Sequence, residues 1–208
     1  CTDMADNFAG RKISFGTADA DVRAVGTRVA LSGTHATIVY PDLTDTELKL
    51  RILGEHQVMN AMATIAVVEA LGLDRARTID ALEQLPLAER WRMQLVERDG
   101  VAIINDAYNA APESMRAALQ TLATLGRDSG RRTIAVLGEM AELGVFSAES
   151  HDSMGRLVVR LNIDQLIVVG AGAKLIHMGA TQEGSWDGES KFFESIDEAL
   201  EHLRGMLR

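Results

Sequence analysis

The stretch VAIINDAYNAAPESM, residues 101–115, joins an apolar strand to a helix through a polar segment. Four polar side chains follow the apolar run: Asn105, Asp106, Tyr108 and Asn109. Pro112 suits the first turn of a helix, where its missing N–H is no loss. A structural explanation is that loops are polar and helices need caps. A functional one is that ligands bind at the carboxyl ends of buried parallel strands, where we expect Asp106 to lie.

Strands and helices alternate around this stretch. Asp99-Gly100 predicts a two-residue hairpin turn between strands at 91–97 and 101–106. Further strands are expected at 133–138, 165–170 and 191–193, and helices from Pro112, at 148–161, from Ala173 and at 195–207. Such alternation is typical of an α/β fold with a mostly parallel sheet covered on both faces.

The first part of the chain has a different pattern. Runs rich in β-branched residues predict strands at 12–16, 21–31, 35–40 and 47–53, followed by helices at 54–73 and 74–84. Pro86 then interrupts the pattern, and PLAER is the best candidate for a boundary. The sequence therefore predicts two domains, residues 1–86 and 87–208.

Composition excludes several classes of protein. The formal net charge of −9 over 208 residues disfavours a nucleic-acid binder, which needs a basic face. A single cysteine, Cys1, cannot form an internal disulfide, which favours a reducing cytoplasm. No apolar run reaches the ~18 residues of a membrane span, so no membrane insertion is expected. The start on Cys1 suggests a piece of a longer protein.

The helix at 54–73 carries a polar stripe. His56, Asn60 and Thr64 recur every four residues, so they share one face of the helix. They either lie on the exposed side of its first turns, which the spacing alone favours, or point at a ligand that approaches Gly54. The sequence leaves both interpretations open.

Charged residues elsewhere are candidates for the same site. Arg90 and Arg92 share a face if their segment is extended, either as solvated surface or as half of an anion site. Glu139 ends the strand at 133–138, a second acid at a strand end. His151-Asp152 is interpreted as a helix cap or a substrate contact, and no metal ligands are assigned.

Two nucleotide-binding motifs are incomplete or absent. GAGAK, residues 170–174, lacks the third glycine of a dinucleotide fingerprint, which disfavours a dinucleotide-dependent oxidoreductase. No G-x-x-x-x-G-K-[ST] motif occurs anywhere in the chain. The nucleotide chemistry must therefore be inferred from other motifs.

Five motifs in a fixed order resemble those of the Mur ligase family. They are GEHQVMNA (54–61), ERWRMQ (89–94), INDAYNAAPESMRAAL (104–119), VLGEMAELG (136–144) and SHDSMGRL (150–157). The resemblance covers nearly the whole chain and points to the member that adds a dipeptide. It implies the end of a central P-loop-type ATPase domain followed by a Rossmann-like C-terminal ligase domain that is truncated at its end. The P-loop and the modified lysine that helps to hold magnesium would then lie upstream.

The resemblance also implies roles for individual residues. His56 and Asn60 match a helix whose asparagine contacts the adenine side of ATP. Arg92 and Asp106 match residues that reach ATP, the latter at the ribose, and are the catalytic candidates. The acceptor pocket is expected to include three residues: Tyr108, Asn109 and Glu139.

The implied reaction is ATP-dependent amide formation between UDP-N-acetylmuramoyl-tripeptide and D-alanyl-D-alanine, in peptidoglycan precursor synthesis. ATP and Mg²⁺ are the implied cofactors, and a monomer is expected. The 208 residues alone are expected to be inactive. Gln57 and Ala111 depart from the asparagines usual in the family. The alternatives are a sibling ligase that adds a single amino acid and a catalytically silent nucleotide-binding or partner-binding domain.

Overall fold

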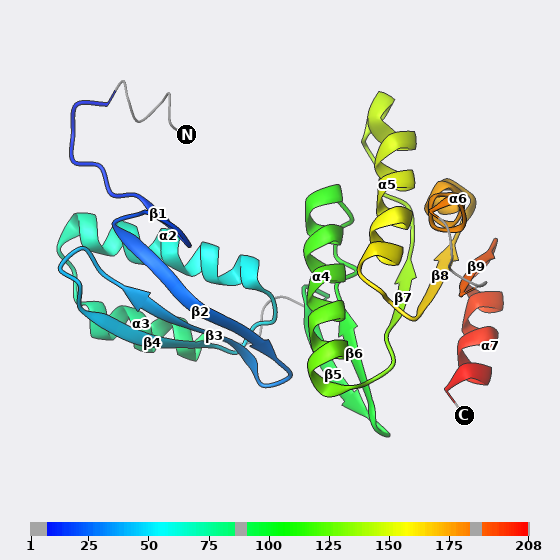
Figure 1. Ribbon diagram of the computed structural model, residues 1–208, viewed down its shortest axis with the longest axis horizontal. Helices are drawn as coiled ribbons and strands as arrows, with labels where there is room; N and C mark the ends of the chain where they lie inside the picture. The colour runs from blue at the N-terminus through cyan, green and yellow to red at the C-terminus, as the bar shows by residue number, and fades with distance from the viewer. Residues whose placement is uncertain (1–7, 86–90, 184–188, 208) are drawn as a thin grey trace. The chain divides into compact units, whose positions relative to one another are not determined.

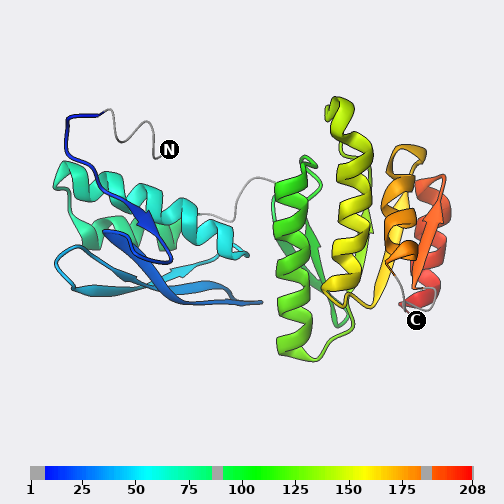
Figure 2. The same ribbon diagram turned by 45° about the horizontal axis from the view of Figure 1, so that its top comes forward.

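The computed structural model of the protein describes residues 8–85, 91–183 and 189–207 (Figures 1 and 2). The chain divides into two compact units. The first comprises Cys1–Glu89 with Met93–Glu97, and the second comprises Arg90–Arg92 with Arg98–Arg208. The candidate boundary PLAER is residues 86–90, which lie outside the described residues, so the two-domain division at 86/87 stays a prediction.

The first unit is a four-stranded sheet with helices packed against it. The strands are β1 (Phe15–Gly16), β2 (Val22–Ala30), β3 (Gly33–Val39) and β4 (Asp45–Leu50), in that order across the sheet. Strands β2, β3 and β4 are antiparallel, whereas β1 pairs in parallel with β2. Helices α2 (Glu55–Leu71) and α3 (Arg75–Gln84) follow, and Figure 2 shows both beside the sheet.

Alternation along the strands explains which face of this sheet is buried. In β3, Ala36 and Ile38 are buried and their neighbours are not, as expected for side chains that alternate between faces. Strand β2 changes its buried parity, because its pairing with β3 shifts between Val25 and Arg28. The buried side chains pack against one side of α2, whose own buried residues include Met62 and Ile65.

The second unit contains a parallel sheet, as the sequence predicts, and it has three strands. Strands β7 (Ile134–Leu137), β8 (Gln165–Val169) and β9 (Ser190–Phe193) lie in this order and pair in parallel. The helices are α4 (Pro112–Ser129), α5 (Ser147–Arg160), α6 (Lys174–Gln182) and α7 (Ile196–Met206), with short 3₁₀ turns at Gly144–Phe146 and Ala171–Ala173. The predicted α/β fold with a parallel sheet is therefore confirmed.

Strand β8 is the centre of this sheet. Leu166, Ile167 and Val168 are consecutive and buried, and consecutive side chains in a strand point to opposite faces, so both faces of β8 are covered. In β7, by contrast, Ala135 is buried while Val136 is 50% exposed. Among the described residues, then, only one face of β7 is covered.

The strand VAIIN pairs with the strand before it and lies outside the parallel sheet. Strands β5 (Gln94–Arg98) and β6 (Val101–Asn105) form a separate two-stranded sheet, and Ile103 in β6 is 50% exposed. The two-residue hairpin is confirmed, because Asp99 and Gly100 both have positive φ, as its turn requires. The expectation that VAIIN is a buried strand of the parallel sheet is wrong. An apolar run shows that a strand forms, but it does not identify its neighbour.

Helices α5 and α6 approach closely through two glycines. A Cβ at Gly155 would overlap the carbonyl oxygen of Ile176, and one at Gly179 would overlap that of Asp152. Neither overlap could be relieved by rotating a side chain, because the obstructing atoms belong to the backbone. These glycines allow the backbones of α5 and α6 to come into contact. Met154 and Val158 of α5 are fully buried in the core of this unit.

None of the helices within residues 8–85, 91–183 and 189–207 has the length and apolar character needed to cross a membrane.

The starts of β7 and β8 are joined by a hydrogen-bonded pair. The backbone N–H and the hydroxyl of Thr133 donate to Oδ2 of Asp164, at 2.7 and 2.8 Å. The N–H of Asp164 donates to Oγ1 of Thr133 at 3.0 Å. The backbone N–H of Thr133 is the largest influence holding the pKa of Asp164 below its ordinary value.

Asp164→Asn is expected to lower the free energy of unfolding by ~1 kcal/mol at neutral pH, because neutral hydrogen bonds replace charge-assisted ones. A carboxylate whose pKa is lowered by folding stabilises the protein above its unfolded pKa and loses that effect as the pH falls through the folded pKa. The difference between wild type and variant should therefore shrink below about pH 4. Urea unfolding at pH 7 and pH 3 measures it, and an unchanged difference at both pH values would contradict the assignment.

Candidate functional site

The polar segment after β6 forms a compact loop. Asp106 follows the strand directly and is half-buried, whereas Tyr108 and Asn109 are exposed. The side-chain oxygen of Asn105 accepts from the N–H of Ala107 at 3.2 Å, and that of Asn109 accepts from the next N–H, of Ala110, at 2.9 Å. Asn105 and Asn109 thus stabilise turns within this segment, which supports the structural explanation of its polar residues. The functional explanation stays open.

Arg92 lies over the ring of Tyr108. The guanidinium carbon is 4.1 Å from the ring centroid, and the N–H of Tyr108 donates to the carbonyl of Trp91 at 3.0 Å. These contacts join two segments that the sequence analysis treated separately. The cation–π contact holds an exposed arginine beside the loop that carries Asp106.

The backbone around Arg92 is not extended. Trp91 has φ of 71° and Met93 has φ of 47°, both in the left-handed region that non-glycine residues rarely adopt. The predicted strand at 91–97 begins only at Gln94. The extended-face interpretation of the two arginines is therefore wrong at Arg92, while Arg90 lies outside the described residues. Left-handed residues of this kind concentrate at ligand sites.

Helix α4 begins with an incomplete cap. Ala111 is the N-cap residue and has no side-chain acceptor, whereas the hydroxyl of Ser114 accepts from the N–H of Ala111 at 3.1 Å. Pro112 occupies the first helical position, as predicted. Half of a capping box is therefore formed, and the half that an asparagine or serine at position 111 would supply is missing.

Glu139 lies at the carboxyl end of β7, beside the loop that follows β8. It is exposed, and its carboxylate occupies the space where a side chain on Gly172 would lie. The parallel pairing of Leu137 with Val168 brings these two strand ends together. The expectation that Glu139 follows a parallel strand is confirmed, whereas its contact with Gly172 is not predictable from residue spacing.

His151 is not a substrate contact. It is fully buried, its Nε2 accepts from the N–H of Met140 at 3.0 Å, and its Nδ1 faces the carbonyl of Ser147 at 2.7 Å. An N–H must face an acceptor and a carbonyl must face a donor, so the ring is neutral with its proton on Nδ1. The substrate and capping interpretations are both wrong, since His151 instead anchors the residue after Glu139.

His151 is accordingly expected to be the Nδ1–H tautomer in solution. Nitrogen-15 NMR of the imidazole should show a protonated Nδ1 and an unprotonated Nε2 at neutral pH, with His151→Gln identifying the signals. A protonated Nε2 would show that the bond to Met140 is absent. His35 and His202 are only partly buried and serve as internal references.

In the first unit, His56 and Asn60 lie on α2 and share a hydrogen-bonding partner. The amide nitrogen of Gln57 is 3.1 Å from Nε2 of His56, and its oxygen accepts from the amide of Asn60 at 3.2 Å. His56 is half-buried and Asn60 is exposed. Gln57, noted as a departure from the family, thus links both candidate residues.

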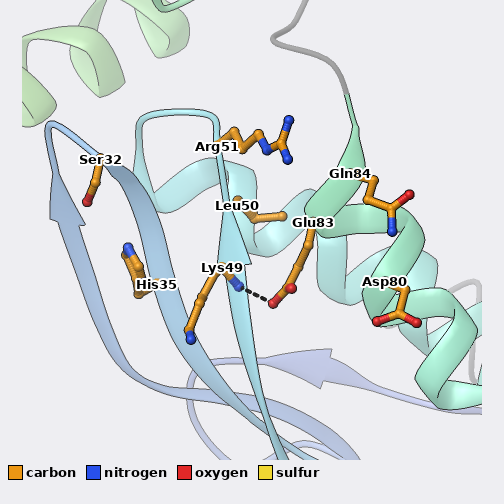
Figure 3. Close-up of a pocket in the computed structure, with 8 residues that line it drawn as sticks. All are labelled: Ser32, His35, Lys49, Leu50, Arg51, Asp80, Glu83 and Gln84. Carbon is orange, nitrogen blue, oxygen red and sulfur yellow. Dashed lines mark hydrogen bonds between the residues drawn. The ribbon is translucent and has the colours of Figure 1, made fainter.

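The first unit also contains a pocket that the sequence analysis did not predict (Figure 3). Its lining mixes bases and acids, and the backbone N–H of Lys49 donates to Oε1 of Glu83 across it at 2.9 Å. The residues that line it are Ser32, His35, Lys49, Leu50, Arg51, Asp80, Glu83 and Gln84. None of the predicted site residues is among them.

The candidate residues thus form separate groups. Arg92 and Tyr108 are in contact, as are Glu139 and Gly172, and both pairs belong to the second unit. His56 and Asn60 belong to the first. Within the described part of the chain, no three or more His, Cys, Asp or Glu side chains are grouped so that they could hold a metal ion.

Comparison with protein families identifies the class. A family model described as Mur ligase, glutamate ligase domain, matches residues 91–208. The chain belongs to the Mur ligase family.

Curated relatives share the name UDP-N-acetylmuramoyl-tripeptide–D-alanyl-D-alanine ligase. The protein from Mycobacterium tuberculosis (strain H37Rv) is 47% identical over 145 residues, covering 67% of this chain and 28% of the relative. The Bacillus subtilis protein is 36% identical over 169 residues, covering 79% of this chain and 35% of the relative. The chain therefore spans about a third of the length of these curated relatives.

Solved structures agree on the fold. A crystal structure of MurF from Acinetobacter baumannii has a TM-score of 0.82 and 30% identity, covering 94% of this chain and 40% of that one. MurF from Thermotoga maritima in complex with ADP has a TM-score of 0.75, and the match covers 94% of this chain and 42% of that one. At 23% identity, this second likeness shows the fold alone.

Proposed function

We propose that this chain belongs to an ATP-dependent ligase that joins D-alanyl-D-alanine to UDP-N-acetylmuramoyl-tripeptide. The observation that carries the proposal is the loop after β6, where Tyr108 holds Arg92 beside the segment that carries Asp106, in a domain of the Mur ligase family. The names of the curated relatives support the dipeptide acceptor. The pathway would be peptidoglycan precursor synthesis in the cytoplasm, serving cell shape and cell division.

The reaction would proceed in two steps. The terminal carboxylate of the tripeptide attacks the γ-phosphorus of ATP, which releases ADP and gives an acyl phosphate. The amine of D-alanyl-D-alanine then attacks the acyl carbon and loses a proton, and phosphate leaves as the amide forms. Catalysis of such a sequence depends on positioning and on electrostatic stabilisation of the phosphoryl group.

Each unit, considered by itself, carries described side chains suited to part of an adenine nucleotide. The guanidinium of Arg92 presents donors suited to phosphate oxygens, and its stacking on Tyr108 limits its motion. The carboxylate of Asp106 can accept hydrogen bonds from ribose hydroxyls. The linked side chains of His56 and Asn60 offer donors and acceptors for a base edge.

Magnesium is the implied metal, and the described residues do not supply a full set of ligands for it. Residues 8–85, 91–183 and 189–207 contain no group of three or more His, Cys, Asp or Glu side chains placed to hold a metal ion. Mg²⁺ is usually held by carboxylates together with substrate phosphates. No step is therefore assigned here to metal ligands of this chain.

The acceptor would bind at the strand ends of the second unit. Tyr108 and Asn109 are exposed on the loop after β6, and Glu139 is exposed after β7. A carboxylate suits the ammonium group of a dipeptide, and an asparagine amide suits its peptide bond. A sibling ligase that adds one amino acid would keep Arg92 and Asp106 and differ at these positions.

The test is phosphate release by the full-length protein supplied with ATP, Mg²⁺ and UDP-N-acetylmuramoyl-tripeptide. We expect release that requires D-alanyl-D-alanine and is not supported by single amino acids. Release with a single amino acid instead would identify a sibling ligase. The absence of release with every acceptor would favour a catalytically silent nucleotide-binding domain.

A variant pair tests the nucleotide site in the same assay. Arg92→Ala should lower kcat/KM for ATP by about tenfold to a hundredfold, the scale of a charge-assisted hydrogen bond to phosphate. Arg116→Ala removes an exposed arginine of α4 and controls for the loss of charge. Equal effects of the two substitutions would contradict the role of Arg92.

We further expect light scattering to show that the full-length protein is a monomer.

A further inference from the structure

Glu139 is an exposed carboxylate that lies against the backbone of Gly172. Within the described residues it forms neither an ion pair nor a hydrogen bond. A negative charge in this position repels the phosphates of a nucleotide and attracts an ammonium group. What holds the carboxylate in place thus decides how well such a group would be bound.

We propose that Gly172 and His151 are positioning residues for the acceptor, because together they fix the Glu139 carboxylate where it meets the ammonium group of D-alanyl-D-alanine. This inference rests on the proposed function and deepens it. It assigns roles to two residues that make no contact with the substrate themselves. Their substitution is expected to change the affinity for the dipeptide, whereas substitution of Arg92 is expected to change the affinity for ATP.

The two glycines of GAGAK have different physical roles. Gly170 has φ of 90°, which a side chain would strain, yet a Cβ there would meet nothing within 4 Å. Gly172 is outside the positive-φ region, but a Cβ there would overlap Cδ and both carboxylate oxygens of Glu139. Glycine at position 172 is therefore required by the carboxylate and not by the backbone.

His151 fixes the other side of Glu139. Its Nε2 holds the N–H of Met140 at 3.0 Å, and the Met140 side chain is 1% exposed in the core. Its Nδ1 donates to Ser147 in the first turn of α5, which joins the loop to a helix of the same core. The backbone at Glu139 is thereby anchored one residue downstream, and only its own side-chain torsions remain free.

A methyl group at position 172 would overlap the Glu139 carboxylate directly. The overlapping atoms are the far end of a flexible side chain, so Gly172→Ala should fold and should displace the carboxylate. The displacement removes an interaction with the acceptor and leaves the nucleotide site unchanged. Gly172→Ala is therefore expected to change KM for the dipeptide and not KM for ATP.

The experiment is a double-mutant cycle in the full-length protein, using Glu139→Ala, Gly172→Ala and both together. We expect each single substitution to raise KM for D-alanyl-D-alanine about tenfold, the scale of one hydrogen bond to a charged group. The double variant should resemble Glu139→Ala alone. Gly205→Ala, where a Cβ in α7 meets nothing within 4 Å, is the matched control and should leave every constant unchanged.

Three results would overturn the proposal. Independent, multiplicative losses in the cycle would show that Gly172 does not act through Glu139. A change confined to KM for ATP, or for the tripeptide, would assign the carboxylate to another ligand. An active ligase unaffected by Gly172→Ala would refute the inference and leave the proposed function intact. If wild type shows no turnover dependent on the dipeptide, the proposed function itself fails.

A second pair of variants tests His151 in the same assay. His151→Gln keeps an acceptor that can reach the N–H of Met140, whereas His151→Leu removes it. The leucine variant should raise KM for the dipeptide as Gly172→Ala does, and the glutamine variant should restore most of the affinity. Equal effects of both would limit His151 to a structural role. If the leucine variant does not fold, the cycle on Gly172 decides alone.

Discussion

The parallel pairing of β7 with β8 is the constraint on which the second unit depends. It places the ends of both strands at one edge of the sheet, so the residues that follow Leu137 and Val168 become neighbours. The loop after β7 supplies a carboxylate, Glu139, and the loop after β8 supplies a backbone without a side chain, Gly172. Neither feature has a function alone, and their contact follows from strand register.

The same sheet requires close packing behind it. Gly155 and Gly179 let α5 and α6 approach to backbone contact, and α5 carries His151 into the core at the level of the loop after β7. A buried histidine that donates at one nitrogen and accepts at the other links helix to loop with both polar atoms satisfied. Packing and polar satisfaction thus act together to anchor the backbone next to Glu139.

Most of the fold could be predicted from the sequence, because strand and helix periods are local properties. The hairpin turn at Asp99-Gly100 and the start of α4 at Pro112 depend on residues whose backbone preferences are strong. The separation of β6 from the parallel sheet could not be predicted, since an apolar run does not specify which sheet its strand joins. Likewise, the left-handed residues that flank Arg92 are a tryptophan and a methionine, which carry no local preference for that conformation.

The sequence indicates which residues are candidates for the site, but it does not show which of them are in contact. Asp106, Tyr108 and Glu139 are candidates because polar side chains at strand ends are conspicuous in sequence, and their roles stay predictions. The stacking of Arg92 on Tyr108 and the role of Gly172 depend on tertiary approach, which spacing does not reveal. His151 was misassigned because its neighbour Asp152 made the pair resemble a polar surface motif. Burial, which only the structure shows, gives it a different role.

The most direct test of this account is a crystal structure of the full-length protein with ADP and D-alanyl-D-alanine bound. We predict that the ammonium group of the dipeptide lies within hydrogen-bonding distance of the Glu139 carboxylate, with that carboxylate still against Gly172. The nucleotide should contact Arg92 and Asp106. A dipeptide bound away from Glu139, or a Glu139 side chain turned from Gly172 toward the nucleotide, would contradict the account.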